Sequence, residues 1–311
     1  MVHQYINNGY HIVLDVNSGA IHVVDEVVYD VIPLFEKHSS EEITGLLREK
    51  YSEEEIREAV EEVSQLKKEG SLFTPDTYEA PLIDFKKRPT VVKALCLHIA
   101  HDCNLACRYC FAEEGEYHGR RALMSYETGK AALDFLIANS GSRRNLEVDF
   151  FGGEPLMNFE VVKQLVAYGR EQEKLHDKHF RFTLTTNGVL LNDDIMEFAN
   201  REMDNVVLSI DGRKEVHDHM RPFRKGAGSY DLIVPKFQKF AKSRNQEKYY
   251  VRGTYTHFNT DFSKDVLHLA DLGFKQISVE PVVAEETDDY AIKEEDLPVL
   301  FKEYDLSLIH I

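Results

Sequence analysis

The sequence has no long hydrophobic segment. Its longest apolar runs, such as "VVKALCLHIA", are far shorter than the roughly 20 apolar residues that span a bilayer. The N-terminus, "MVHQYINNGYHIVLDV", lacks the basic residues and the following apolar run of a secretory signal. We therefore predict a cytoplasmic protein with no membrane partner.

Basic residues are scarce relative to acidic ones. The 311 residues include 37 Lys and Arg against 54 Asp and Glu, and the formal net charge is −17. A surface that follows nucleic-acid phosphates needs a basic stripe, and none is visible in the sequence. We therefore expect no nucleic acid among the partners.

Cysteine is also scarce, with four residues, and none follows Cys110. Three of them lie in "HDCNLACRYCF", at Cys103, Cys107 and Cys110, with C-x3-C-x2-C spacing. In a reducing cytosol, clustered thiols bind metal or carry out redox chemistry more often than they form disulfides. The fourth, Cys96, lies inside a predicted strand, where we expect a buried structural thiol.

The N-terminal part predicts a small α+β module over residues 1–74. Three short strands, "HQYIN", "HIVLDV" and "AIHVVD", are separated by the turn sequences "NNG" and "NSG". Three helices are predicted at 26–37, 40–50 and 52–69, with Ser40 and Ser52 as N-caps and Gly70 as a stop signal. The module resembles a winged helix. Residues 75–91 contain three prolines and no periodicity, which predicts a linker.

The remaining chain, 92–305, predicts an α/β domain with a parallel sheet. Strands rich in Val, Ile, Leu and Phe alternate with amphipathic helices, as in sheets buried on both faces. Ligands of such sheets lie at the carboxyl ends of the strands. The predicted strands are 95–100, 146–151, 180–186, 206–210, 249–255 and 276–279, and the helices are 125–138, 159–175, 193–201, 230–243, 262–272 and 294–303.

Polar and glycine-rich motifs follow successive predicted strands. They are the cysteine loop, "GGEP" at 152–155, "TTNG" at 185–188, "SIDG" at 209–212 and "EP" at 280–281. Glycines after a strand let the backbone approach a ligand with no Cβ in the way, and Glu154 would offer an anion to an ammonium group. We expect these motifs to share one edge of the sheet. His98 and His101 are expected to pack beside it, and His217 and His219 to lie in a loop without binding metal.

Three thiolates on a short loop suit an iron–sulfur cluster or another soft-metal site. A [4Fe–4S] cluster held by three cysteines leaves one iron open to a substrate or cofactor. A zinc site or incidental thiols are the alternatives.

The cysteine spacing, with an aromatic residue before the last cysteine, resembles the signature of the radical S-adenosylmethionine (SAM) superfamily. "KALCLHIAHDCNLACRYCFA", "EVDFFGGEPLMNFEVVK", "FRFTLTTNGVLLNDD" and "VVLSIDGRKEVHD" resemble the six-cysteine-peptide (SCIFF) thioether maturases, as do "VLDVNSGAIHVVD", "YYVRGTYT" and "QISVEPVVAEE". The resemblance implies a partial (β/α)6, TIM-like radical SAM barrel preceded by a peptide-recognition module.

The resemblance also implies the cofactors and their contacts. Cys103, Cys107 and Cys110 would ligate three irons of a [4Fe–4S] cluster, and SAM would chelate the fourth. The expected SAM contacts are "GGE" for the amino group, aromatic residues beside the adenine, "SIDG" for the ribose and carboxylate, and two arginines for the carboxylate. These residues are Tyr109, Phe111, Gly152, Gly153, Glu154, Asn187, Ser209, Asp211, Arg221 and Arg252. Asn187 is equally suited to capping a turn.

The implied reaction releases a 5′-deoxyadenosyl radical that takes hydrogen from a ribosomal precursor peptide, whose cysteine sulfur then bonds to that carbon. The expected partners are this peptide, with its leader on the N-terminal module, and an electron donor such as flavodoxin or ferredoxin. An edge strand, with "AIHVVD" as the candidate, would pair with the leader; a scaffold role for the module is the alternative.

Other interpretations of the sequence stay open. The core would equally suit a peptide epimerase or a formylglycine-forming sulfatase maturase, and a non-catalytic iron–sulfur or zinc scaffold is a third class. The resemblance further predicts a cysteine-rich (SPASM-type) domain that would follow the core. The last residues, "LSLIHI" at 306–311, depart from the family pattern, and we interpret them as a non-native tail of a truncated fragment.

Overall fold

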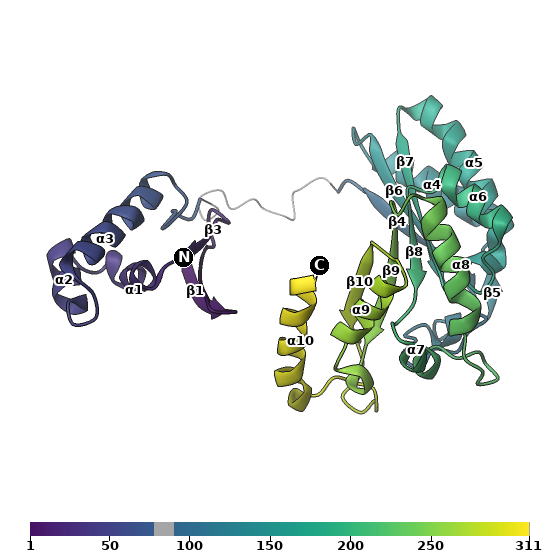
Figure 1. Cartoon of the computed structure of the whole chain (residues 1–311). Coiled ribbons are helices and arrows are strands. Elements are labelled where there is room, and N and C mark those ends of the chain that lie inside the picture. The colour runs from purple at the N-terminus through teal and green to yellow at the C-terminus, as the bar shows by residue number, and fades with distance from the viewer. Residues whose placement is uncertain (78–89, 311) are drawn as a thin grey trace. The chain divides into compact units, whose positions relative to one another are not determined.

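The computed structural model describes residues 1–77 and 90–310, and the chain divides into two compact units, Met1–Pro89 and Thr90–Ile311. The first unit contains the predicted N-terminal module, and the second contains the predicted α/β domain (Figure 1). Most of the predicted linker at 75–91, like Ile311, lies outside the described residues.

The N-terminal unit has the predicted three strands and three helices. The strands form an antiparallel sheet in the order β1-β2-β3, and the first hairpin turns at Asn8 and Gly9, which both have positive φ, as a two-residue turn of this kind requires. The elements are β1 (Val2–Asn7), β2 (Tyr10–Asp15), β3 (Ile21–Val24), α1 (Glu26–Phe35), α2 (Ser40–Leu47) and α3 (Glu53–Lys68).

Two capping boxes define where α2 and α3 begin. The Ser52 hydroxyl accepts a hydrogen bond from the Glu55 amide, and the Glu55 side chain accepts one from the Ser52 amide. The same box joins Ser39 and Glu42. The predicted N-cap Ser52 is therefore confirmed. The prediction of Ser40 is wrong by one residue, because Ser39 has the extended backbone that a cap needs.

One face of the small sheet packs on the helices and the other is exposed. Val13, Val31 and Ile56 belong to a core that is separate from the core of the second unit. Ile21 and Val23, on edge strand β3, are 66% and 64% exposed. This unit therefore has a hydrophobic core of its own.

The second unit contains a seven-stranded sheet in the order β10-β9-β8-β7-β6-β4-β5. Six strands run parallel and confirm the predicted βα succession, while the short β5, which was not predicted, pairs antiparallel with β4. The strands are β4 (Ala94–His101), β5 (Ala122–Leu123), β6 (Asn145–Gly152), β7 (His179–Thr186), β8 (Asn205–Ser209), β9 (Tyr249–Tyr255) and β10 (Ile277–Pro281).

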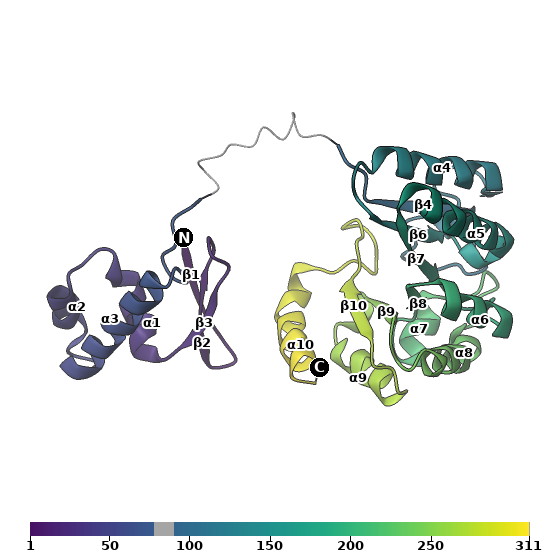
Figure 2. The same cartoon turned by 90° about the horizontal axis from the view of Figure 1, so that it is seen from above.

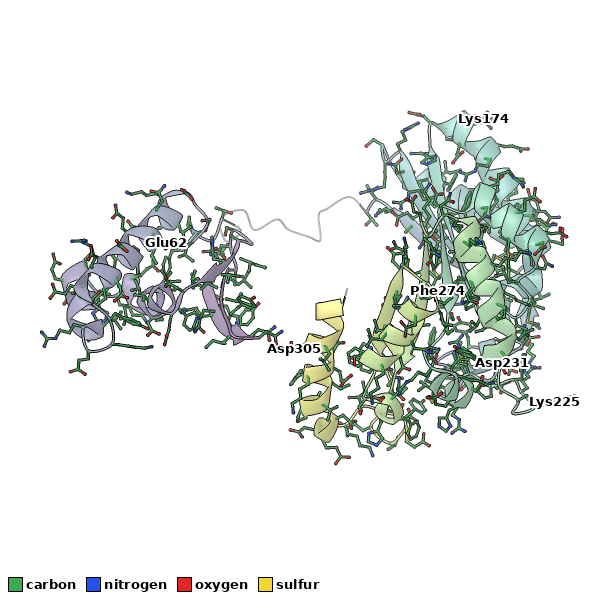
Figure 3. All side chains as sticks on the ribbon, in the orientation of Figure 1. Glu62, Lys174, Lys225, Asp231, Phe274 and Asp305 are labelled. Atoms are coloured by element: carbon green, nitrogen blue, oxygen red, sulfur yellow. The ribbon has the colours of Figure 1, made fainter. Side chains whose placement is uncertain are left out.

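The helices cover the outer face of the curved sheet. Figure 2 shows the strands as an arc with α4, α5, α6, α8 and α9 outside it. Side chains fill the layer between sheet and helices, while charged residues such as Lys174 and Asp231 lie on the outside (Figure 3). The helices are α4 (Tyr126–Asn139), α5 (Phe159–His176), α6 (Asp193–Glu202), α7 (Lys214–Met220), α8 (Tyr230–Ser243), α9 (Ser263–Asp271) and α10 (Leu297–His310).

The strands are buried on one face only, so the prediction of burial on both faces is wrong. On β6, Val148 and Phe150 are buried under the helices, whereas Glu147 and Asp149 point to the inner face and are partly exposed. In a closed barrel, inward side chains fill the interior. Here β10 and β5 are the two edges of an open arc, so the inner wall remains accessible. The partial barrel that we predicted is therefore confirmed.

No helix among the described residues is long and apolar enough to cross a membrane.

Candidate active site

The three clustered cysteines lie in one cavity at the carboxyl ends of the strands. The loop after β4 contributes them, and the ends of β6, β7 and β8 supply the opposite wall. Of the predicted site residues, the cavity is lined by Cys103, Cys107, Tyr109, Cys110, Phe111, Gly152, Gly153, Asn187, Ser209 and Arg221. Three others, Glu154, Asp211 and Arg252, are not among the lining residues.

Gly152 and Gly153 allow the chain to approach its own cysteine loop. A Cβ on Gly153 would lie 2.2 Å from the Asp102 carbonyl oxygen, and one on Gly152 would lie 2.5 Å from the Ala100 carbonyl oxygen. The Gly153 amide donates to the Ala100 carbonyl at 2.7 Å, and the Glu154 amide donates to the Asp102 carbonyl at 2.8 Å. The glycines therefore join the end of β6 to the start of the cysteine loop, which the sequence did not indicate.

Glu154 is fully buried and is hydrogen-bonded within the protein. Its Oε1 accepts from the Thr186 hydroxyl at 2.7 Å and the Leu156 amide at 3.0 Å, and Oε2 accepts from the Asn187 amide at 2.8 Å. Burial raises the pKa of the Glu154 carboxyl, while these three donors oppose that shift. The carboxylate thus fixes the end of β7 against the end of β6.

Asn187 caps a turn, one of the two roles that the sequence left open, and also contacts the cysteine loop. Its Oδ1 accepts from the Val189 amide at 3.0 Å, as in a turn. Its Nδ2 donates to the Asn104 side chain at 2.7 Å and lies 3.5 Å from Cys103 Sγ, which also lies 3.5 Å from the Leu105 amide. Hydrogen bonds to sulfur are a feature of iron–sulfur sites.

Arg221 reaches the cavity from the segment after α7. Its Nη1 donates to the Tyr109 hydroxyl at 2.8 Å, and that hydroxyl lies 2.8 Å from both carboxylate oxygens of Asp211. Asp211, expected beside the ribose or carboxylate of SAM, is 1% exposed and lies outside the cavity lining. Arg221 and Ser209, in contrast, reach the cavity wall.

The end of α7 and the segment after it also support the cysteine loop through their backbone. The Ala106 amide donates to the Pro222 carbonyl and the Arg108 amide donates to the Met220 carbonyl, both at 2.9 Å, and Leu105 forms a β-bridge with Phe223. Sequence reasoning missed this support, since no local pattern connects residues so far apart in the chain.

The loop predicted around His217 and His219 is a helix, α7, so that prediction is wrong. His217 is fully buried, with Nδ1 3.3 Å from the Asp211 amide and Nε2 2.9 Å from the Ser229 hydroxyl. Burial lowers the pKa of His217 to about 3. In α7, His217 and Met220 are buried, three positions apart on one face. A helix of seven residues is too short for this spacing to predict it from sequence.

His98 and His101, both on β4, pack as predicted. Each ring contacts the ring of Tyr117, which lies outside the strand. The ring centroids lie 4.4 Å and 4.9 Å from that of Tyr117. Phe111 at the edge of the cavity is 70% exposed, and its ring meets Tyr117 edge-on.

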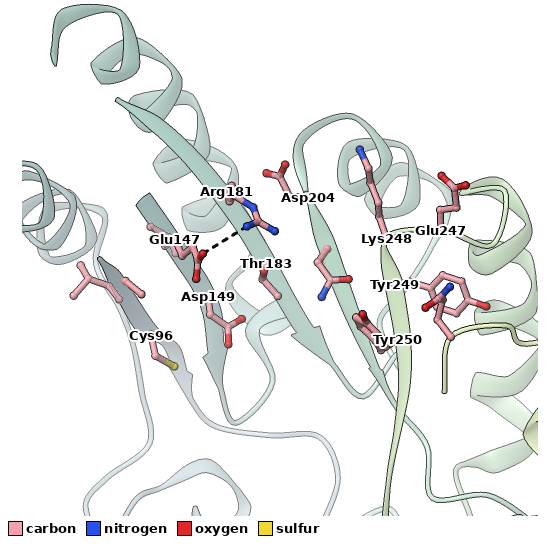
Figure 4. Close-up of a pocket in the computed structure, with 15 residues that line it drawn as sticks. Cys96, Glu147, Asp149, Arg181, Thr183, Asp204, Glu247, Lys248, Tyr249 and Tyr250 are labelled. Carbon is pink, nitrogen blue, oxygen red and sulfur yellow. Dashed lines mark ion pairs between the residues drawn. The ribbon is translucent and has the colours of Figure 1, made fainter. Parts of the chain in front are cut away.

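A second cavity, of about 610 Å³, occupies the amino-terminal half of the inner wall (Figure 4). Asp149 lies directly beside Cys96 on β4 and Thr183 on β7, and Glu147 forms an ion pair with Arg181. Cys96 is exposed here, so the prediction of a buried thiol is wrong: its side chain points to the inner wall instead of the helices. Burial raises the pKa of Asp149 to about 6.

Arg252 and Glu280 pair with each other on the same inner wall. Both are exposed, on β9 and β10, and their side chains form an ion pair. Arg252 lies beside Ser209 in the strand register, which places it next to the cavity without lining it.

The donor set of the cavity suits an iron–sulfur cluster. Burial raises the pKa of the Cys103 thiol to about 12 and that of Cys107 to about 11, so the thiols hold their protons until a cation replaces them. Among the described residues, no group of three His, Cys, Asp or Glu side chains is arranged to hold a single metal ion. In a multi-iron cluster, each cysteine binds a different iron, so its ligands need not converge on one point.

A family model for the radical SAM superfamily matches residues 97–272, which is more than half of the chain. Among curated proteins, the chain is 31% identical to an uncharacterized protein of Methanocaldococcus jannaschii over 60% of this chain and 62% of that protein. It is 23% identical to the radical SAM cyclopropyl synthase TigE of Paramaledivibacter caminithermalis, over 55% of this chain and 38% of TigE. The chain therefore spans less than two thirds of the length of these relatives.

Two solved structures share the fold. Native anSMEcpe with bound AdoMet has a TM-score of 0.62 at 19% identity, covering 69% of this chain and 59% of that one. SuiB of Streptococcus suis bound to S-adenosylmethionine has a TM-score of 0.53 at 17% identity, covering 97% of this chain and 67% of that one. The SuiB alignment therefore includes the N-terminal unit.

Proposed function

The chain belongs to the radical SAM superfamily, and from that membership we propose that it modifies a ribosomally made, cysteine-rich precursor peptide by forming thioether bonds from cysteine sulfur to carbon. The observation that carries the enzymatic part is the cavity that brings three cysteines together with Gly152, Gly153, Asn187, Ser209 and Arg221 at one rim of the barrel. The thioether product rests on the sequence resemblance.

The residues of the cavity would hold both cofactors of the family. Cys103, Cys107 and Cys110 would bind the [4Fe–4S] cluster, and the Arg221 guanidinium would pair with the carboxylate of SAM, for which its planar fork is suited. When bound, these cofactors supply a 5′-deoxyadenosyl radical. The protein orients the groups and limits the access of water. A small reducing protein, such as flavodoxin or ferredoxin, would deliver the electron.

The open inner wall provides space for a peptide. The inward side chains of β6 and β7 continue from Asp149 and Thr183 in the second cavity to Phe151 and Thr185 in the cysteine cavity. The wall carries the polar side chains of Asp149 and Thr183 in the second cavity and the apolar ring of Phe151 beside the cysteines. An extended peptide segment lying along it would place one residue beside the cysteine cavity.

The N-terminal unit would capture the leader of the precursor. Its edge strand β3 exposes Ile21 and Val23, and an edge strand can pair with an extended peptide. Its helices carry acidic rather than basic surfaces, as "SEEEIREAVEEV" shows, which does not suit DNA. The SuiB alignment covers 97% of this chain, so the likeness to SuiB in fold extends over this unit as well as the barrel.

Deleting residues 1–74 is expected to weaken precursor binding strongly and to leave SAM cleavage intact. The reason is that the two units have separate hydrophobic cores, so the barrel does not need the module to fold. Binding of the precursor would be measured by fluorescence anisotropy, and SAM cleavage by chromatography. Equal peptide affinity without the module would contradict the leader role.

A point variant makes this test sharper. Val23→Glu places a charge on the exposed β3 strand and is expected to lower leader affinity, whereas Leu46→Glu, on α2 and 56% exposed, is the matched control and should leave it unchanged. Equal losses in both variants would indicate a general effect of charge instead of a site at β3.

A further inference from the structure

Three polar side chains from separate segments form a partly buried link in the wall of the cysteine cavity. Tyr109 belongs to the cysteine loop, Asp211 follows β8, and Arg221 follows α7. The Tyr109 hydroxyl stands between the other two, donating to the carboxylate and accepting from the guanidinium.

Asp211 is held firmly on the side away from the cavity. Its Oδ1 also accepts from the Thr254 amide at 3.2 Å, and its own amide donates to Nδ1 of His217 at 3.3 Å. The Nε2 of His217 meets the Ser229 hydroxyl, which donates to the Arg221 carbonyl at 2.7 Å. The backbone of Arg221 and the carboxylate of Asp211 are therefore fixed by the same network.

Arg221 retains an unused donor. Its Nε is buried and has no hydrogen-bond partner among the described residues, although the side chain lines the cavity. A buried N–H group normally has a partner, so Arg221 has a hydrogen-bond donor that the described residues do not use.

The interposed hydroxyl explains why this donor stays available. A direct arginine–carboxylate pair is commonly bidentate and uses two N–H groups of the guanidinium. With Tyr109 between them, Asp211 balances the charge of Arg221 while a single N–H is used. The remaining face of the guanidinium can then serve a ligand.

We propose that Tyr109 and Asp211 are positioning residues that hold the Arg221 guanidinium ready for the carboxylate of an amino-acid-bearing ligand, and that neither side chain binds this ligand itself. The proposal rests on the proposed function, because SAM is the ligand whose methionine end carries that carboxylate. It gives Asp211 a different role from the direct SAM contact predicted from sequence.

The test is a double-mutant cycle on the iron-loaded full chain, with Tyr109→Phe, Arg221→Gln and the double variant. Dissociation constants would be measured for SAM and for 5′-deoxyadenosine, which lacks the methionine carboxylate, together with the iron and sulfide content of each variant. Tyr168→Phe is the matched control, since Tyr168 also bonds an aspartate, Asp134, but between α4 and α5.

We expect Arg221→Gln to weaken SAM binding about 10- to 100-fold, the range for a lost charged hydrogen bond. Tyr109→Phe should weaken it about 10-fold, because Asp211 and Arg221 can then pair directly. The double variant should bind SAM as Arg221→Gln does, since residues acting through one group are not additive. Binding of 5′-deoxyadenosine, iron content and the Tyr168→Phe control should not change.

Additive losses, or an equal loss for 5′-deoxyadenosine, would overturn the proposal by showing that Tyr109 contacts the ligand directly. Loss of iron in Tyr109→Phe would also overturn it, because Tyr109 would then be needed for the loop itself. Failure of the unaltered, iron-loaded chain to bind SAM would instead contradict the proposed function.

Discussion

Cys107→Ala is expected to abolish the iron–sulfur absorbance of the reconstituted protein and, with it, the cleavage of SAM. Cys107 lines the cavity with Cys103 and Cys110, and the amides on both sides of it, at Ala106 and Arg108, are bound to carbonyls at the end of α7 and just after it. This backbone support fixes the position of the sulfur. The fourth cysteine, Cys96, lies outside the cavity and is not placed to replace the lost ligand.

The chain contains its own control for this experiment. Cys96→Ala removes a thiol that is exposed on the inner wall and lies outside the cysteine cavity, so iron content and absorbance should stay as in the unaltered protein. Iron and sulfide analysis with visible absorption would compare the two variants. Unchanged cluster content in Cys107→Ala, or equal losses in both variants, would refute the assignment of the ligands.

Glu154→Gln is expected to destabilise the barrel by about 3 kcal/mol, because at least one buried N–H or O–H group loses a charged acceptor. The three groups around the carboxylate, from Leu156, Thr186 and Asn187, all donate to it. A glutamine has one acceptor oxygen, and its NH2 group would face one of these donors. The end of β7, with Asn187, should then separate from the end of β6.

Thermal unfolding would measure this effect, with an expected decrease of roughly 10 °C in the midpoint of the barrel transition. Glu147→Gln, on the same strand, is the control: its ion pairs with Lys93 and Arg181 are partly exposed and contribute little. SAM affinity should decrease in Glu154→Gln and stay unchanged in the Glu147→Gln control. A Glu154→Gln variant as stable as Glu147→Gln would contradict the role of Glu154 as the acceptor that joins the strand ends.

The strands and most helices could be predicted from sequence because their signals are local. Hydrophobic periodicity and turn residues placed all six parallel strands, and the motifs that follow them meet at one rim, as the topology of a parallel sheet requires. The cysteine spacing likewise identified the three thiols of the cavity. The prediction that the strands are buried on both faces overlooked the alternation in β6, where Glu147 and Asp149 stand between buried apolar residues, as in a strand with one accessible face.

The contacts that organise the site are long-range, and local patterns do not encode them. Tyr109 meets Asp211 across 102 positions and Arg221 across 112. Nor could the sequence show that position 153 must be glycine because the Asp102 carbonyl leaves no room for a Cβ. The sequence likewise did not show that the carboxylate of Asp211 is bonded within the protein, to the Tyr109 hydroxyl and the Thr254 amide.

The central claim is that the three cysteines hold a cluster with an iron open to SAM, and its most direct measurement is the formation of 5′-deoxyadenosine. The full chain would be reconstituted anaerobically with iron and sulfide, reduced with dithionite and incubated with SAM, and the products would be separated by chromatography. We predict 5′-deoxyadenosine and methionine in equal amounts, and neither from Cys107→Ala. An iron-loaded protein that forms no 5′-deoxyadenosine under these conditions would contradict the account.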